Sequence, residues 1–95
     1  MSWKLLYHAK VAEDLQALGA AEAANVMQVI DSRIRHGEPD KLGKPLRGSL
    51  AGYRRVRTGN IRIIYRVHVE TNEVFIMAAG PRRNDEVYAS AKKRS

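Results

Sequence analysis

The spacing of hydrophobic and polar positions predicts a strand and two helices in the first part of the chain. Trp3–Tyr7 is a short apolar run suited to a strand. From His8 to Leu18, apolar residues recur at helical spacing, and Gly19 follows as a stop signal. Ala20–His36 shows the same spacing and is rich in alanine, which favours helix. We expect these two helices to form a hairpin that packs on a sheet.

The second part of the chain is predicted to be mostly strands. Tyr53–Arg57 and Ile61–Val67 form a central hairpin around the turn at 58–60, and Glu73–Ala79 is the next strand. Gly80 and Pro81 interrupt the chain, and Asp85–Lys93 then favours a short helix. The predicted order is β-α-α-β-β-β-α. We therefore expect one domain over residues 1–95, an α+β fold of two layers with an antiparallel sheet covered on one face by the helical hairpin.

The two strands of the central hairpin carry five arginines, although like charges on neighbouring strands repel. Strand side chains alternate between faces. If the branched residues face the helices, Arg55, Arg57 and Arg62 converge on the open, solvent-facing side of the sheet. Arg54 and Arg66 are interpreted as solvated side chains. A sheet that tolerates this repulsion is expected to bind an anionic partner.

Charge is distributed unevenly along the 95 residues. Residues 1–40 carry a net charge of −2 and residues 41–95 a net charge of +9, for a total of +7. A basic patch attracts phosphates, whereas the plainer interpretation is a soluble basic surface. The chain has no cysteine, which fits a reducing cytoplasm. No segment approaches the roughly 20 apolar residues that span a bilayer, so we expect no membrane partner.

Arginine is suited to phosphate because its planar guanidinium matches two phosphate oxygens. Arg82, Arg83 and Tyr88 are expected to reach the basic face from the C-terminal tail and complete a phosphate clamp. A tyrosine phenol can stack on a base or relay a proton. Arg83 could equally be a surface charge.

Other candidate chemistry is sparse. His8, His36 and His68 match no metal spacing and are interpreted as surface residues. The carboxylates concentrate in the helical half and suggest neither a metal site nor an acid–base pair on the basic face. We expect no metal and no cofactor.

Three segments resemble the RelE family within the RelE/ParE toxin superfamily. They are Lys44–Gly48, the central hairpin with its spaced Gly59, Arg62 and Tyr65, and the tail Gly80–Tyr88. The hairpin pattern is shared across the superfamily. The tail, with an arginine six residues before a tyrosine, points more narrowly to ribosome-dependent mRNA interferases.

This resemblance implies a toxin of a type II toxin–antitoxin pair that acts in the cytoplasm. Such toxins enter the ribosomal A site, cut the mRNA codon there and so inhibit translation. The implied reaction is attack of the ribose 2′-OH on the adjacent phosphate without a metal. It yields a 2′,3′-cyclic phosphate or 3′-phosphate end and a 5′-OH end.

The resemblance also implies residue roles. Arg62 would bind the scissile phosphate, Arg55 would take the place of a catalytic basic residue, and Arg82 would assist the leaving 5′ oxygen. Tyr88 would stack on or orient the nucleotide and help to activate the 2′-OH. Contacts with RNA or the ribosome are implied for Lys41, Lys44, Arg47, Arg54, Arg57 and Arg83.

The chain departs from the family at two positions. Arg55 stands where relatives often have a catalytic lysine, and a guanidinium with a pKa above about 12 is a poor general base. Val87 precedes Tyr88 where the YoeB-like branch has a histidine. The general base is therefore left unassigned by the resemblance.

Two alternatives remain open at this level. A ParE-like toxin would share the fold but inhibit DNA gyrase without cutting RNA, and a degenerate toxin would retain only antitoxin binding. The implied partners are the ribosome, mRNA and an acidic, RelB-like antitoxin that covers the basic face or displaces the final helix. DNA contact would occur only through that antitoxin.

Overall fold

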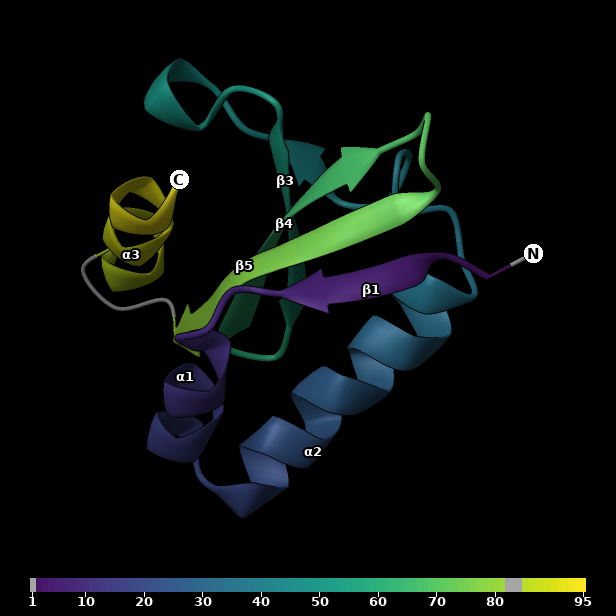
Figure 1. Cartoon of the computed structure of the whole chain (residues 1–95). Coiled ribbons are helices and arrows are strands. Elements are labelled where there is room, and N and C mark those ends of the chain that lie inside the picture. Colours follow the sequence, from purple (N-terminus) through teal and green to yellow (C-terminus); the bar gives the residue numbers. More distant parts are fainter. Residues whose placement is uncertain (1, 82–84) are drawn as a thin grey trace.

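A single mixed sheet of five strands forms the centre of the protein (Figure 1). The structure is a computed structural model that describes residues 2–81 and 85–95. The strand order is β1-β5-β4-β3-β2, with all neighbours antiparallel except β1 and β5. The strands are β1 (Lys4–Tyr7), β2 (Lys44–Pro45), β3 (Tyr53–Thr58), β4 (Ile61–His68) and β5 (Glu73–Pro81).

Helices lie on both faces of this sheet (Figure 1). On one face are α1 (Val11–Leu18) and α2 (Ala20–Val29), and α2 continues as a π-helical segment, Ile30–Arg35. On the other face is α3 (Glu86–Arg94). A short 3₁₀ turn, Gly48–Leu50, lies in the loop between β2 and β3.

The α+β class and the predicted element order are confirmed, with three corrections to the layout. The sheet is mixed because β1 runs parallel to β5, with the helical hairpin and the other strands between them in the chain. The two-residue β2 adds an edge strand. The face expected to be open is partly covered by α3, which makes a third layer because Val87 and Ala91 bury their side chains on the sheet.

The hydrophobic core is divided by the sheet into two clusters. Under α1 and α2, the cluster centres on Val26 and Ile30 against Ile63 and Ile76. Under α3, the residues are Leu50, Tyr53, Ile64, Met77, Ala78, Val87 and Ala91. Burying both faces explains why β4 is almost continuously apolar in its first half.

A β-bulge in β5 lets two consecutive residues pack in the cluster under α3. Ile64 pairs with Ala78 and Tyr65 pairs with Ile76, so Met77 is the extra residue. Met77 and Ala78 both pack in the cluster under α3. The bulge lies outside the β3–β4 hairpin, whose pairing is unbroken from Tyr53–Arg66 to Thr58–Ile61. The alternation of its arginines is therefore preserved.

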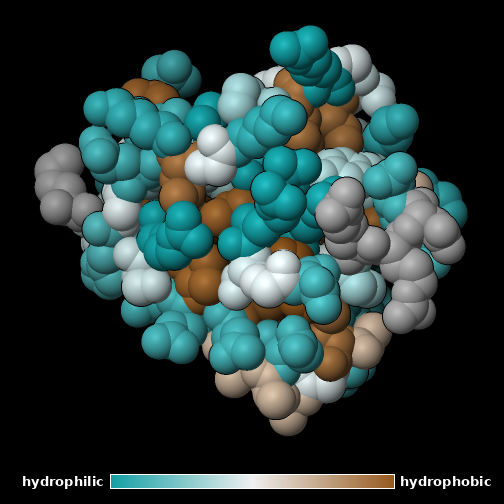
Figure 2. All heavy atoms as spheres, turned by 180° about the vertical axis from the view of Figure 1, so that it is seen from behind, coloured by the Kyte–Doolittle hydropathy of each residue, from teal (hydrophilic) through white to brown (hydrophobic). Residues whose placement is uncertain are grey.

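Hydrophilic side chains cover most of the surface seen in Figure 2, and hydrophobic side chains show between them. No helix among the described residues has the length and apolar character needed to cross a membrane.

Candidate functional site

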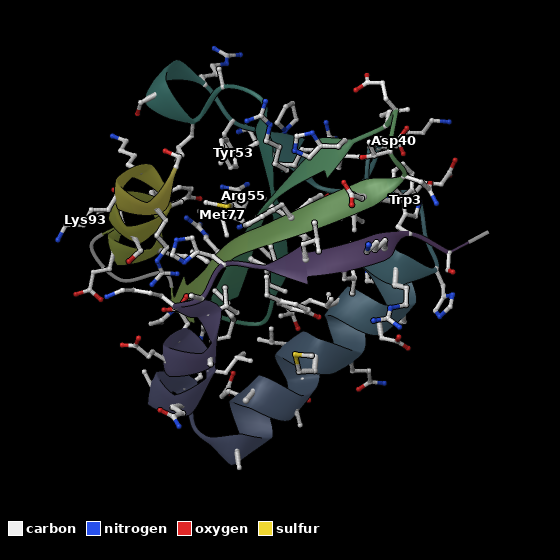
Figure 3. All side chains as sticks on the ribbon, viewed as in Figure 1. Trp3, Asp40, Tyr53, Arg55, Met77 and Lys93 are labelled. Carbon is white, nitrogen blue, oxygen red and sulfur yellow. The ribbon has the colours of Figure 1, made fainter. Side chains whose placement is uncertain are left out.

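Two guanidinium groups and one phenol meet on the α3 side of the sheet. Arg55 Nη1 on β3 and Arg62 Nη1 on β4 each donate to the hydroxyl of Tyr88 on α3, at 2.9 Å. The Arg62 Cζ atom lies 5.6 Å from the centroid of the Tyr88 ring, within the range of a cation–π contact. Figure 3 labels Arg55 with Tyr53 and Met77 on the side of the sheet that faces α3. This cluster thus joins three elements of the fold: β3 through Arg55, β4 through Arg62 and α3 through Tyr88.

The alternation of side chains along β3 and β4 explains why Arg55 and Arg62 lie on the same face of the sheet. Val56 packs under α1 and α2, so Arg55 and Arg57 point to the opposite face. Arg57 pairs directly with Arg62 across the hairpin, which places Arg62 on that same face. The three arginines therefore share the face that the sequence predicted.

The exposure of Arg62 corrects the expectation that it faces solvent. Its relative exposure is only 7%, because α3 covers it. Arg55 is half-buried, and Arg57 is exposed. A buried guanidinium is held in one geometry, which suits a group that must meet a particular phosphate oxygen.

A cleft of about 520 Å³ opens beside these side chains. Lys44 pairs opposite Arg55 across the β2–β3 ladder and adds a further cation to its wall. The residues that line the cleft are Lys44, Pro45, Leu46, Arg47, Arg55, Arg62, Asp85 and Tyr88. Four of these eight are cationic, so the cleft is an anion-binding environment.

The positive charge of this cleft is little compensated. Among the residues that the structure describes, neither Arg55 nor Arg62 forms an ion pair. The Nε–H groups of both arginines are buried and find no acceptor in the same part of the chain. Buried donors without an acceptor cost about 1–3 kcal/mol each, which favours binding of an acceptor-rich anion.

The loop that carries Lys44 is fastened to the sheet from its other side. Arg54 Nε donates to the Leu42 carbonyl at 2.8 Å. The fully buried Tyr65 hydroxyl lies 2.9 Å from the Pro39 carbonyl oxygen and 3.0 Å from that of Leu42. Tyr65 is therefore a core residue, and Arg54 holds a loop instead of being solvated as the sequence predicted.

Gly43 allows this loop to lie directly on β3. Its backbone adopts φ +71°, and a Cβ atom there would lie 2.1 Å from the Arg55 carbonyl oxygen. Only glycine combines this conformation with this contact. The close approach sets the register that places Lys44 beside Arg55.

The remaining predicted residues are spread more widely. Lys41 is exposed and pairs with Glu38 at 3.3 Å. Arg66 lies over the Tyr53 ring, with Cζ 5.7 Å from its centroid, near the C-terminal end of α3. Arg82 and Arg83 lie outside the described residues.

Asp85 is a cleft residue that the sequence pattern did not indicate. The pattern predicted it only as the start of the last helix, yet it lines the cleft with Arg55 and Arg62. The signal was available, because residues three apart at a helix start lie on the same side, and Asp85 is three residues before Tyr88. Elsewhere, no group of three His, Asp or Glu side chains in the described ranges could hold a metal ion.

A family model described as "ParE toxin of type II toxin-antitoxin system, parDE" matches residues 5–86. The chain belongs to the RelE/ParE superfamily of type II toxins. The match covers the sheet except Lys4, both helices of the hairpin and the cleft arginines on β3 and β4. The resemblance found in the sequence is thereby confirmed at the level of the superfamily. Curated protein sequences give no match.

Solved structures of RelE toxins share this fold. The RelBE2 toxin–antitoxin complex of Mycobacterium tuberculosis matches with a TM-score of 0.79 and 29% identity, over 86% of this chain and 93% of that one. A free mutant of Escherichia coli RelE matches with a TM-score of 0.66 and 25% identity, over 99% and 98%. The RelE–RelB complex of Pyrococcus horikoshii matches with a TM-score of 0.67 and 24% identity, over 88% and 99%.

Proposed function

We propose that this toxin is a metal-independent endoribonuclease that cleaves mRNA in the ribosomal A site and so inhibits translation. The observation that supports this most is the convergence of Arg55, Arg62 and Tyr88 in a basic cleft. A phosphodiester under attack gains negative charge on its oxygens, and preorganised donors lower the energy of that state. Buried guanidinium groups are such donors.

In the proposed reaction the ribose 2′ oxygen bonds to phosphorus and the bond from phosphorus to the 5′ oxygen breaks. Arg62, the more buried arginine, binds the scissile phosphate and stabilises its developing charge. Arg55, which stands where relatives often have a lysine, binds oxygens of the same phosphate. Tyr88 orients the nucleotide, and Arg82 assists the leaving 5′ oxygen.

The proposed RNA and ribosome contacts surround this centre. Lys44 and Arg47 line the cleft, and Arg57 is exposed beside it. Phosphate contacts of this kind supply affinity and position, not sequence recognition. Lys41, Arg54 and Arg83 are further candidates, and Arg54 would contribute by holding the basic loop in place.

The direct test is cleavage of mRNA on ribosomes. Purified toxin is added to ribosomes programmed with a defined mRNA, and the new 5′-OH ends are mapped. Arg62→Ala is expected to slow cleavage by about 10²-fold or more. Arg33→Ala, which removes an exposed arginine on the opposite, helical face, is the matched control and should cleave at the wild-type rate. Intact mRNA despite growth arrest in cells would contradict the proposal.

The second candidate is a ParE-like toxin that inhibits DNA gyrase, and the description of the matching family model favours it. Under this alternative the Arg55–Tyr88–Arg62 group stabilises α3 and has no catalytic role. Inhibition of supercoiling by purified toxin, together with uncut mRNA in the ribosome assay, would select it. A toxin inactive in both assays would retain only antitoxin binding.

We also propose an acidic, RelB-like antitoxin as partner, which acts in the cytoplasm where mRNA is translated. Structures of RelE–RelB complexes among the neighbours support this choice. The partner would cover the basic cleft or displace α3, and would carry any contact with DNA. Capture of a neighbouring acidic protein by tagged toxin in its native host tests this.

A further inference from the structure

The hydrogen bonds at Tyr88 restrict what its phenol can do. A phenol has one O–H donor and two acceptor lone pairs. Arg55 and Arg62 each donate to that oxygen at 2.9 Å, which occupies both lone pairs. In this arrangement the hydroxyl can give a proton but has no lone pair free to take one. Activation of a 2′-OH needs a proton acceptor, so another group must supply it.

The other residues of the cleft leave one candidate for the group that accepts the proton of the 2′-OH. Lys44, Arg47, Arg55 and Arg62 are cationic at neutral pH and cannot accept a proton. Pro45 and Leu46 are apolar. Of the described residues that line the cleft, Asp85 is the single carboxylate. From this composition we infer that Asp85 is the general base that takes the proton from the 2′-OH, an inference that rests on the proposed ribonuclease function.

The backbone holds Asp85 in a defined place relative to Tyr88. The Asp85 carbonyl accepts the amide hydrogens of Tyr88 and Ala89, both at 3.1 Å. Asp85 has φ +55° and ψ +28°, a left-handed conformation that aspartate tolerates better than most residues. The chain turns sharply there, so Asp85 lines the cleft at the start of α3, one turn before Tyr88.

The proposed step balances with these two groups. Asp85 takes the proton of the 2′ hydroxyl as the bond from the 2′ oxygen to phosphorus forms. The bond from phosphorus to the 5′ oxygen breaks, and that oxygen receives the proton of the Tyr88 hydroxyl. Arg55 and Arg62 stabilise the resulting phenolate as well as the phosphoryl oxygens. Solvent then returns a proton to Tyr88 and removes one from Asp85.

The test compares single-turnover cleavage by saturating toxin on ribosomes programmed with one mRNA at neutral pH. Wild type, Asp85→Asn, Asp85→Glu and the control Glu70→Gln are measured. Glu70 is an exposed carboxylate in the β4–β5 turn, outside the cleft. Asp85→Asn should slow cleavage by about 10²- to 10⁴-fold. Asp85→Glu should recover part of the rate, and Glu70→Gln should match wild type.

Binding and folding controls separate a base from a structural role. Asp85→Asn and Glu70→Gln should half-saturate ribosomes within about threefold of the wild-type concentration and unfold at the same temperature, because both positions are exposed and asparagine, like aspartate, tolerates the left-handed conformation of residue 85. A wild-type rate for Asp85→Asn would overturn the inference while leaving the ribonuclease function intact. Slow cleavage by Tyr88→Phe together with a wild-type rate for Asp85→Asn would assign the base to Tyr88 instead. Uncut mRNA with wild-type toxin would overturn both the function and the inference.

Discussion

Arg94 near the end of α3 and Asp14 of α1 form a two-point ion pair beside β5, although 80 residues separate them. Arg94 Nη1 lies 2.7 Å from Asp14 Oδ2, and Nη2 lies 2.9 Å from Oδ1. Arg94 Nη1 also donates to the Met77 carbonyl, and Asp14 Oδ2 accepts the Ala79 amide hydrogen. The hydrogen bonds to Asp14 raise the pKa of Arg94. This pair fastens the helix that carries Tyr88.

Breaking this pair should destabilise the protein. The two side chains are only 11% and 15% exposed, so removing one leaves the other poorly solvated. Asp14→Ala also deprives the Ala79 amide of its acceptor. We expect Asp14→Ala to lower the free energy of unfolding by about 2–3 kcal/mol, measured by urea titration.

The matched control is the Asp31–Arg35 pair on the π-helical segment that follows α2. Its side chains are 63% and 45% exposed, and the closest contact is 3.7 Å. Asp31→Ala should change the free energy of unfolding by less than about 0.5 kcal/mol. Equal effects of the two substitutions would show that the Arg94–Asp14 pair adds nothing beyond a surface contact.

The Tyr65 hydroxyl should contribute to stability in a pH-dependent way. Tyr65→Phe removes the hydrogen-bond donor to Pro39 and Leu42 and should cost about 1–2 kcal/mol at pH 7. Burial raises the pKa of Tyr65 above its ordinary value of about 10. The folded protein therefore holds this proton more tightly than the unfolded chain does. Its contribution is complete below pH 10 and is lost as pH rises through the folded-state pKa.

The measurement is a comparison of urea midpoints for wild type and Tyr65→Phe at pH 7, 9 and 11. The gap between the proteins should be constant from pH 7 to 9 and narrow by pH 11. Tyr7, whose pKa is also raised by burial, is present in both proteins and does not affect the difference. A gap that stays constant to pH 11 would show that Tyr65 does not titrate in this way.

Gly43→Ala should disturb the cleft more than an alanine at another left-handed glycine. At Gly43 the new Cβ atom meets the Arg55 carbonyl oxygen at 2.1 Å, whereas at Gly59 nothing lies within 4 Å. Both substitutions carry the left-handed cost of about 1–2 kcal/mol. Gly43→Ala should add at least about 1 kcal/mol and reduce mRNA cleavage, because Lys44 loses its register beside Arg55. Similar losses of stability and activity in both variants would contradict this account.

Lysine substitutions should distinguish the roles of Arg55 and Arg62 in cleavage. Arg55 is half-buried and stands where the family often has lysine, so Arg55→Lys should keep mRNA cleavage within about tenfold of wild type. Arg62 is buried, and its planar guanidinium donates a hydrogen bond to Tyr88. Lysine cannot reproduce this planar group with its several donors. Arg62→Lys should lower the single-turnover rate by about 10²-fold with little change in half-saturation. The reverse order of effects would exchange the proposed roles of Arg55 and Arg62.

Local patterns were sufficient to determine much of this protein. Hydrophobic spacing located the helices and strands within a few residues, because each element must bury one face. Alternation along the hairpin placed Arg55, Arg57 and Arg62 on one face, since the pairing of β3 with β4 is unbroken. The resemblance of the hairpin and tail was enough to indicate the toxin superfamily that the family model then confirmed.

Contacts between residues distant in the chain were decided only by the tertiary structure. The sequence did not show that α3 would cover the second face, because Val87 and Ala91 are a weak apolar signal until Ile64 and Met77 lie beneath them. That packing buries Arg62 and brings Tyr88 to it, and the turn before α3 brings Asp85 into the cleft. Local spacing fixes which way a side chain points from its own element. Which groups it meets depends on how elements far apart in sequence pack together.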